Sequence, residues 1–289
     1  MSALLIAGAT GQIGRGVLDE LRADGRPLRA LVRDPDRAIL PAGVQSERGD
    51  YDDPSSLRQA FEAVEVLLLV GRDNPQAVAQ GLRVLDAARQ AGVRHVVRLS
   101  ALGARRDSPV ALMREHAEVD AALQHSDMAW TLIQPHLYMQ NLLRAAEAIQ
   151  REGVLAAPMG QHAFPLVDTR DVAAAAATIL RDVSAHAEQT HVLTGPESVD
   201  YRQVAAVLSQ VAGRSVAYQA VSPETFERRL LDAGLADWRA FDLAHIASAY
   251  TEADHAVQPK LAQLLGRPPR TLERFAADHA DLFSAAGPH

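Results

Sequence analysis

The chain contains no cysteine, which excludes whole classes of protein chemistry before any motif is considered. Disulfide bonds, thiolate zinc sites, iron–sulfur clusters and a cysteine nucleophile all require a thiol. Lysine is nearly as scarce, because Lys260 is the single lysine among 289 residues and arginine supplies the rest of the positive charge. Any reaction step that needs a lysine elsewhere in the fold is therefore excluded.

Aromatic residues and basic clusters are also few. Phe, Trp and Tyr make up 4% of the chain, and 29 basic against 36 acidic residues give a net charge of −7. We therefore expect neither a basic nucleic-acid surface nor a base-stacking platform. No basic segment precedes a long apolar run at the start of the chain, so we expect neither a signal peptide nor a membrane span. These features favour a soluble cytoplasmic protein that binds neither nucleic acid nor membranes.

Strand-like and helix-like segments alternate through the first half of the chain. A short polar residue precedes proline at Asp53, Asn74 and Ser108, and each pair predicts a capped helix start. Strands that alternate with helices predict parallel strands joined by right-handed crossovers. The expected fold is α/β, a Rossmann-type doubly wound parallel sheet that binds its ligand at the carboxyl ends of the strands. The expected strands lie at residues 3–7, 28–32, 44–48, 66–70, 93–99 and 130–133.

After Pro135 this alternation becomes less regular, and no linker or repeat divides the chain. We predict a nucleotide-binding core at 1–135, to which a later segment at about 166–195 returns. Residues 136–289 are predicted to form mostly a smaller, interleaved C-terminal lobe that binds the substrate. The expected helices of this part lie at 137–151, 172–180, 200–212 and 223–249, and its expected strands at 191–194 and 216–218.

A glycine-rich turn, GATGQIG at 8–14, follows the first predicted strand and opens an amphipathic helix. In this context Gly8 permits a sharp turn, Gly11 lets the backbone approach a pyrophosphate, and Gly14 lets helix and strand pack closely. The helix N-terminus offers amides and partial positive charge to phosphate. The alternative is a structural turn without a ligand. The turn residues predicted to contact the cofactor are Gly8, Thr10, Gly11, Gln12 and Ile13.

Arg33 ends the second predicted strand, about 20 positions after the glycine turn. An acidic residue there holds a ribose hydroxyl, whereas an arginine suits a 2′-phosphate because its planar fork matches phosphate oxygens. The neighbouring Asp34 points to the opposite side if the strand continues. The sequence therefore favours NADP(H) over NAD(H), with a solvated surface arginine as the alternative.

The ends of the other strands complete the expected cofactor site. Asp50 and Tyr51 follow the third strand, where Asp50 could accept a hydrogen bond from the adenine amino group or simply cap a turn. Val70-Gly71-Arg72 follows the fourth strand and Ser100 the fifth, and both ends should face the ribose–nicotinamide half of the cofactor. The strand-end residues predicted to bind the cofactor are Arg33, Asp50, Tyr51, Val70, Gly71, Ser100 and Pro135.

Several of these motifs together resemble the atypical short-chain dehydrogenase/reductases, and the NmrA-like branch in particular. They are GATGQIG, LVRDP at 31–35, GDYDDPSSL at 49–57 and the proline after the sixth strand. The resemblance extends to VDTRDVA at 167–173 and to the segment 264–283. That branch includes NADPH-dependent quinone oxidoreductases, triphenylmethane-dye reductases and NADP-sensing regulators, so the resemblance implies NADP(H) binding.

One departure from the wider group concerns its Tyr-x-x-x-Lys dyad. Lys260 has Ala256 four positions before it, so this chain has no such dyad. The resemblance places His116 where the lysine stands and Leu112 where the tyrosine stands. His116 could then bond the nicotinamide ribose or donate a proton near neutral pH. The alternative is a core histidine, since His116 lies on an apolar helical stripe.

The segment after Pro135 contributes His136 and Tyr138, both candidates for the substrate pocket, and Tyr138 is with His116 a predicted catalytic residue. A core or rim position is the alternative for each. The histidines at 116, 125, 136 and 162 are not spaced as a metal-binding set, so we expect no metal.

These observations predict an NADPH-dependent oxidoreductase that passes hydride to an electrophilic acceptor such as a quinone or a dye. Such acceptors need placement more than a strong general acid, so the missing dyad does not forbid the reaction. The acceptor is expected to be a small hydrophobic molecule. The alternatives are a non-catalytic NADP(H)-sensing regulator of the NmrA type and, third, an isomerase or dehydratase. The oligomeric state is open, with a homodimer among the options.

Overall fold

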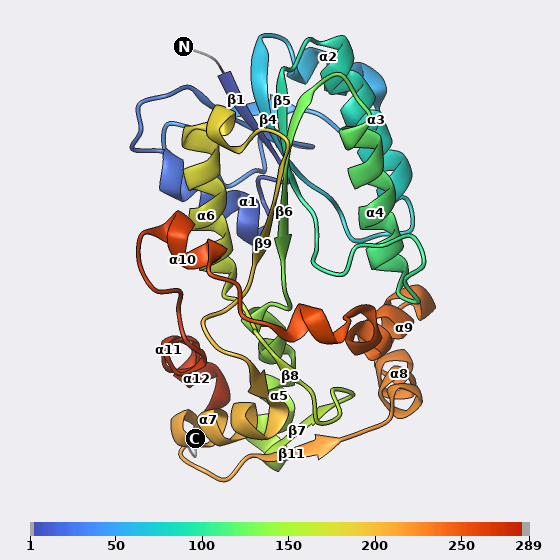
Figure 1. Ribbon diagram of the computed structural model, residues 1–289, viewed down its shortest axis with the longest axis vertical. Coiled ribbons are helices and arrows are strands. Elements are labelled where there is room, and N and C mark those ends of the chain that lie inside the picture. Colours follow the sequence, from blue (N-terminus) through green and yellow to red (C-terminus); the bar gives the residue numbers. More distant parts are fainter. Residues whose placement is uncertain (1–2, 285–289) are drawn as a thin grey trace. The chain divides into compact units, whose positions relative to one another are not determined.

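The computed structural model describes residues 3–284, and the chain divides into two units (Figure 1). Residues 1–2 and 285–289, which the predicted domain bounds include, lie outside the described residues. The first unit takes in the chain up to Asp107 together with Leu112–Gln134 and Arg170–Val192. The second takes in Ser108–Ala111, Pro135–Thr169 and the chain from Leu193 onward.

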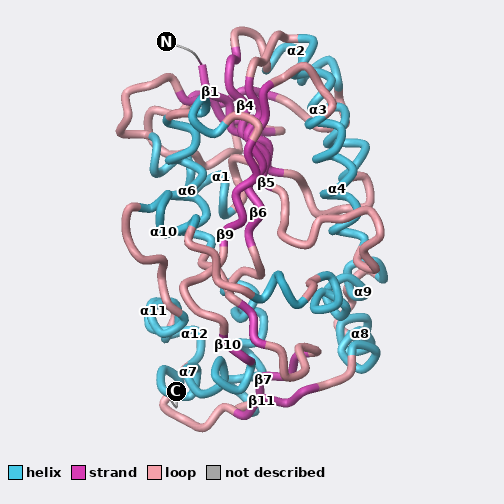
Figure 2. The backbone as a smooth tube through the Cα atoms, in the orientation of Figure 1, coloured by secondary structure: helices cyan, strands magenta, loops and turns pink. Residues whose placement is uncertain are grey.

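A seven-stranded sheet with the order β3-β2-β1-β4-β5-β6-β9 forms the centre of the first unit (Figure 2). Every strand pair from β3 through to β6 runs parallel. The order reverses between β1 and β4, which is the point where a doubly wound sheet binds its ligand. The predicted Rossmann-type fold is thereby confirmed. The strands are β1 (Ala3–Ala7), β2 (Leu28–Val32), β3 (Gln45–Arg48), β4 (Val64–Val70), β5 (His95–Leu99), β6 (Ala129–Pro135) and β9 (Gln189–Leu193).

Helices cover both faces of this sheet, with α1 and α6 on one side and α3 and α4 on the other (Figure 1). The two helices on the first side approach closely, because a Cβ added at Gly16 would lie 2.7 Å from the Cβ of Ala173. The second side buries a continuous cluster that includes Leu67, Val84 and Val119. The helices are α1 (Gln12–Leu21), α2 (Pro54–Ala60), α3 (Ala77–Gln90), α4 (Ala111–Gln124), α6 (Thr169–Arg181) and the short 3-10 helix η2 (Val183–His186).

One of the three predicted helix starts is correct, and the other two lie two residues before the helix begins in the structure. Asp53 accepts hydrogen bonds from the amides of Ser55 and Ser56, and Pro54 is the first residue of α2, as predicted. The starts expected at the prolines after Asn74 and Ser108 are wrong, because α3 and α4 begin at Ala77 and Ala111. At the first of these, the Asn74 side chain accepts from the Gln76 amide and closes a turn ahead of the helix.

The second unit contains two small two-stranded sheets and a set of short helices. β7 pairs with β11 in parallel and β8 with β10 in antiparallel, and the strands β7, β8 and β10 were not predicted. Its core includes the fully buried Phe164, Leu208, Phe275 and Phe283. The elements are η1 (Met139–Ala145), α5 (Ala146–Glu152), β7 (Val154–Ala157), β8 (Ala163–Phe164), β10 (Val199–Asp200), α7 (Tyr201–Ala212), β11 (Ala217–Ala220), α8 (Pro223–Asp232), α9 (Asp237–His245), η3 (Ile246–Ala249), η4 (Glu252–His255), α10 (Lys260–Leu265), α11 (Leu272–Asp278) and α12 (Ala280–Phe283).

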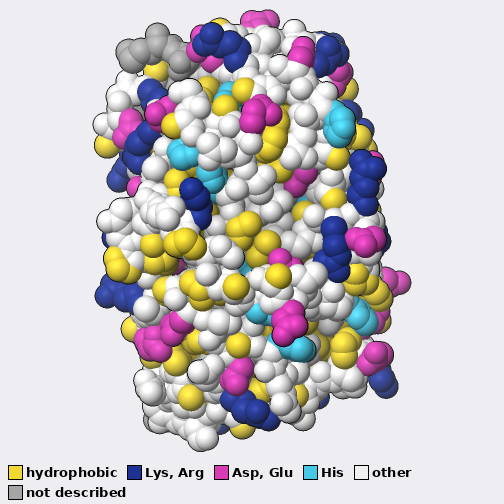
Figure 3. Space-filling model, in the orientation of Figure 1, with side chains coloured by type: hydrophobic (Ala, Val, Ile, Leu, Met, Phe, Trp, Pro, Cys, Tyr) yellow, Lys and Arg dark blue, Asp and Glu magenta, His cyan; other side chains and the backbone are white. Residues whose placement is uncertain are grey.

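Two observations concern surfaces and membranes. On the face that Figure 3 shows, arginine side chains are scattered among acidic ones rather than gathered into one basic patch. Within residues 3–284, no helix combines the length and the apolar character needed to cross a membrane. That the second unit binds the substrate stays a prediction.

Candidate functional site

The turn between β1 and α1 is tight, and two of its glycines are required by its geometry. Gly8 has a φ of +81°, and a Cβ there would lie 2.8 Å from the carbonyl oxygen of Val70. A Cβ at Gly14 would lie 2.3 Å from the carbonyl oxygen of Gly8. Since no side chain fits at either position, these glycines have the turn and packing roles that the sequence predicts.

The N-terminus of α1 is open to an anion. Gly11 occupies the N-cap position in an extended conformation, no side chain caps the helix, and its first turn carries no acidic residue. Thr10, Gly11 and Gln12 are exposed, whereas the Ile13 side chain is buried in the core. Any contact that Ile13 makes with a ligand must therefore come from its backbone. Uncapped amides at a ten-residue helix suit a phosphate group, so this turn fits the pyrophosphate of a dinucleotide.

Arg33 directly follows β2 and is exposed. It has no ion-pair partner among residues 3–284. The neighbouring Asp34 accepts a hydrogen bond from the Asp36 amide at 3.2 Å, so its carboxylate stabilises the local turn at residues 34–36. The guanidinium of Arg33 is thus free to meet an anionic group at this strand end.

Three side chains meet at the ends of β3 and β4. The ring of Tyr51 is buried, and its hydroxyl donates a hydrogen bond to the Val70 carbonyl at 3.1 Å. The Arg72 guanidinium lies over this ring, 4.8 Å from its centroid, and its Nη1 is 3.8 Å from Oδ1 of Asp50. Burial raises the pKa of Tyr51, and the charge of Arg72 opposes this only in part. Tyr51 is therefore neutral and supports this strand end, and the contact of Arg72 with Tyr51 and Asp50 is one that the sequence did not indicate.

A buried ion pair lies between β5 and α4. Nε of Arg98 is 2.9 Å from Oδ1 of Asp120, and both side chains are almost fully buried. The Ser100 hydroxyl donates to the other oxygen of Asp120, so in this structure it is turned toward α4. Burial disfavours both charges, since it raises the pKa of Asp120 and lowers that of Arg98. Each group stays charged because the opposite charge is in contact with it.

His116 on α4 is only partly buried and lies beside this ion pair. Its Nδ1 is 3.5 Å from Nη2 of Arg98. Burial, and then the charge of Arg98, lower the pKa of His116 to about 3. The imidazole is therefore neutral at pH 7. Because the guanidinium can only donate, Nδ1 is the acceptor and Nε2 carries the proton. A hydrogen-bonding role for His116 fits this state, whereas proton donation from a charged imidazolium near neutral pH does not.

His136 and Tyr138 belong to the second unit. His136 is 2% exposed and stacks on Tyr250 with ring centroids 4.3 Å apart. Its Nδ1 accepts a hydrogen bond from the Leu137 amide at 2.7 Å. His136 therefore lies in the core of the second unit, which was the alternative to a place in the substrate pocket. Burial raises the pKa of Tyr138, which is thus neutral at physiological pH. Pro135, the last residue of β6, is buried. The catalytic role of Tyr138 and the cofactor contact of Pro135 stay predictions.

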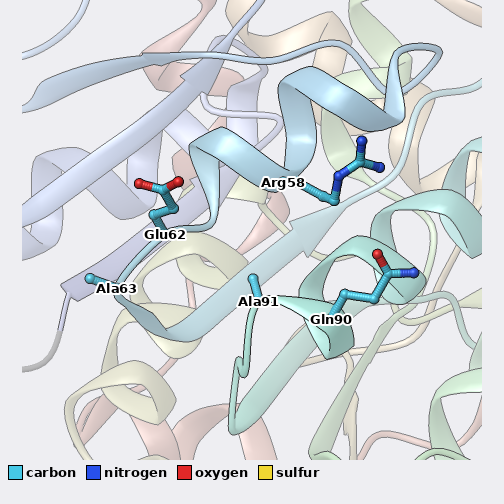
Figure 4. A pocket seen from close by; sticks show the side chains of 5 residues that line it. All are labelled: Arg58, Glu62, Ala63, Gln90 and Ala91. Atoms are coloured by element: carbon cyan, nitrogen blue, oxygen red, sulfur yellow. The ribbon is translucent and has the colours of Figure 1, made fainter.

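A surface depression of about 280 Å³ is shown in Figure 4, and its lining residues place it at the opposite end of the sheet from the glycine turn. It is bounded by the C-terminal ends of α2 and α3, where β4 is about to begin. Ligands of doubly wound sheets bind at the other, carboxyl ends of the strands, so this depression is not the dinucleotide site. No group of three or more metal-ligating side chains is arranged to hold an ion in the described part of the chain. The residues that line the depression are Arg58, Glu62, Ala63, Gln90 and Ala91.

Comparison with known proteins gives consistent matches along the whole chain. A model of the NmrA-like family matches residues 1–276. An NAD(P)H azoreductase of Xenophilus azovorans is 36% identical over 98% of this chain and 100% of its own length. Quinone oxidoreductase 2 of Escherichia coli is 32% identical over 93% of this chain and 96% of its own. Among solved structures, the NADPH-dependent quinone oxidoreductase of Escherichia coli complexed with NADPH superposes with a TM-score of 0.87 at 31% identity, covering 96% of this chain and 99% of that one.

Proposed function

Because the chain belongs to the NmrA-like family, we propose that it is an NADPH-dependent oxidoreductase that reduces an electrophilic hydrophobic acceptor such as a quinone or an azo or triphenylmethane dye. The observation that carries the proposal is the uncapped N-terminus of α1 at the carboxyl end of β1, where the sheet order reverses. The relatives are named for the reduction of azo compounds and of quinones with a nicotinamide cofactor, which supports the oxidoreductase class.

The residues of the first unit divide the cofactor between them in this proposal. The amides at the start of α1, with Thr10, Gly11 and Gln12 exposed around them, hold the pyrophosphate. Arg33 holds the 2′-phosphate, which makes NADPH the preferred cofactor. Asp50 accepts a hydrogen bond from the adenine amino group. When bound, NADPH supplies the hydride for the reduction.

His116 acts as a neutral hydrogen-bond donor in place of the charged lysine in the dyad of the wider short-chain group. Its Nε2–H donates to a hydroxyl of the nicotinamide ribose. Arg98, held by Asp120, donates toward Nδ1 and so keeps the proton on Nε2. No lysine lowers the pKa of a tyrosine here, so the chain lacks a strong proton donor. Acceptors that take hydride readily and are protonated by water suit this arrangement, and simple ketones do not.

The test follows NADPH absorbance with purified protein and a panel of quinones, azo dyes and triphenylmethane dyes. Gly11→Asp should abolish oxidation, because its carboxylate repels the pyrophosphate at the helix N-terminus. Gln90→Asp is the matched control, since it adds the same carboxylate on an exposed residue at the C-terminal end of α3, at the opposite end of the sheet from the glycine turn. Oxidation by the wild type and by Gln90→Asp, but not by Gly11→Asp, would support the proposal. Tight NADPH binding without turnover on any acceptor would replace it with a non-catalytic NADP(H) sensor.

A cytoplasmic location and a homodimer stay predictions beside this proposal. The identity of the acceptor would emerge from the panel, and the oligomeric state from sedimentation of the same preparation.

A further inference from the structure

Arg72 lies at the ligand-binding edge of the first unit and has no part in the function proposed above. It follows Gly71, just beyond the end of β4 and next to the reversal of strand order. Its side chain is 33% exposed. An arginine at this edge is close enough to the expected cofactor to interact with it.

The Arg72 side chain extends toward the end of β3 rather than into solvent. Its guanidinium lies over the ring of Tyr51 at 4.8 Å and approaches Oδ1 of Asp50 at 3.8 Å. A planar guanidinium that covers an aromatic ring with one face can offer its other face to a second flat group.

The platform beneath Arg72 is fixed. Tyr51 is 3% exposed, and its hydroxyl is bonded to the Val70 carbonyl, so the ring cannot swing away. Asp50 uses Oδ1 to accept from the Asp52 amide at 3.2 Å. Its Oδ2 has no hydrogen-bond partner among the described residues, and the side chain is 40% exposed. The edge thus combines a flat cationic surface with a free acceptor, which together match a flat base that carries an amino group.

We propose that Arg72 forms the stacking surface of the adenine subsite. The base packs on the guanidinium face that is turned away from Tyr51, while its amino group donates to Oδ2 of Asp50. This inference rests on the proposed function, because it needs a nicotinamide adenine dinucleotide bound at this edge of the sheet. Adenine is common to both cofactors, so Arg72 strengthens the binding of NADPH and NADH equally, whereas Arg33 distinguishes them.

The test measures the Kd of NADPH and of NADH by calorimetry, without any acceptor present. Arg72→Ala should raise both by the same factor, about 10-fold, which is the range of a partly desolvated cation–π contact. Arg72→Lys keeps the charge but loses the plane, so it should bind as weakly as the alanine variant. Arg94→Ala is the matched control, since Arg94 is an exposed, ion-paired arginine at the amino end of β5 and its loss should change neither Kd. Thermal unfolding of each variant checks that it is folded.

Three results would overturn the inference. A higher Kd for NADPH alone in Arg72→Ala would make Arg72 a phosphate ligand. An unchanged or lower Kd for both cofactors would remove Arg72 from the subsite. Full recovery of both Kd values in Arg72→Lys would mean that the charge of Arg72, and not its planar surface, contributes to binding. The inference and the proposed function fail in different ways. Binding without turnover on any acceptor would end the reductase proposal and leave the adenine subsite standing. Turnover by the wild type together with unchanged Kd values in Arg72→Ala would support the reductase proposal and end the inference about Arg72.

Discussion

Two arginines near the ends of neighbouring strands form ion pairs that differ in distance and in exposure. The Arg98–Asp120 pair on β5 and α4 has its charged atoms 2.9 Å apart, with side chains 5% and 7% exposed. The Arg72–Asp50 pair beyond β4 and β3 has atoms 3.8 Å apart, with side chains 33% and 40% exposed. The exposed Arg72–Asp50 pair contributes little to the free energy of unfolding. In the buried Arg98–Asp120 pair, removal of either partner leaves an uncompensated charge and costs several kcal/mol, about 3–5. The fold therefore fixes one pair and leaves the other free to change partners when a ligand arrives.

Removing the acid from the buried pair should have the largest effect. Asp120→Ala leaves the charge of Arg98 buried without its counterion, and should lower the free energy of unfolding by about 3–5 kcal/mol. Asp50→Ala, the matched change in the exposed pair, should lower it by less than about 1 kcal/mol. Urea unfolding of both variants measures the contrast. Equal losses would mean that the two pairs do not differ in the way their geometry indicates.

Arg33 extends the comparison to an arginine with no ion-pair partner in the described chain. Arg33→Ala should leave the free energy of unfolding nearly unchanged and weaken NADPH binding by about 1.5–3 kcal/mol, as expected for a charge-assisted contact with phosphate. NADH binding should hardly change. Calorimetry with both cofactors tests this, and equal losses for the two would remove the 2′-phosphate assignment.

The smallest effect concerns His116, whose neutral form is favoured first by burial and then by the charge of Arg98. Its pKa is lowered to about 3 from the usual 6.5, so the unfolded chain binds more protons between these values. Stability from this group is therefore complete above about pH 6.5 and is lost as the pH falls toward 3. His116→Gln should reduce the slope of unfolding free energy against pH in that window, by at most about 1.4 kcal/mol per pH unit.

The matching kinetic experiment uses the same variant. The pH–rate profile of the wild type should show no ionisation of His116 between pH 5 and 8, in contrast to an ordinary histidine. A step near pH 6.5 that disappears in His116→Gln would show that the imidazole is charged in solution and would restore it as a proton donor.

Local patterns in the sequence were enough to predict the Rossmann-type sheet and the glycine turn. Most strands of that sheet are short apolar runs, with the polar β3 as an exception, and Gly8 and Gly14 lie in one short segment, so neighbouring residues carry most of the information. The strands β7, β8 and β10 were missed because they are only four, two and two residues long, so that they are defined by their partners rather than by a pattern along the chain. The early helix start at Asn74 has a similar cause, since the side chain caps a turn instead of the helix.

The candidate site was predictable only in part. Arg98 and Asp120 were not singled out, although an arginine inside the apolar strand HVVRL is a signal that a counterion must lie nearby in the fold. The position of Arg72 over Tyr51 depends on how two strand ends meet, which no local pattern encodes. His116 was singled out as a candidate, but its neutral state follows from its burial and from the charge of Arg98, neither of which could be read from α4 alone.

The carbonyl of Val70 links three strand ends before any ligand is present. It receives the Tyr51 hydroxyl from beyond β3 and lies against Gly8 at the end of β1. Changes at Val70, Gly8 or Tyr51 would therefore disturb the whole edge at once, whereas Arg33 and Arg72 project from it and can be exchanged one at a time. In the proposed site, cofactor preference and cofactor affinity are separate adjustments for engineering, the first made at Arg33 and the second at Arg72, while the support beneath them is left as it is.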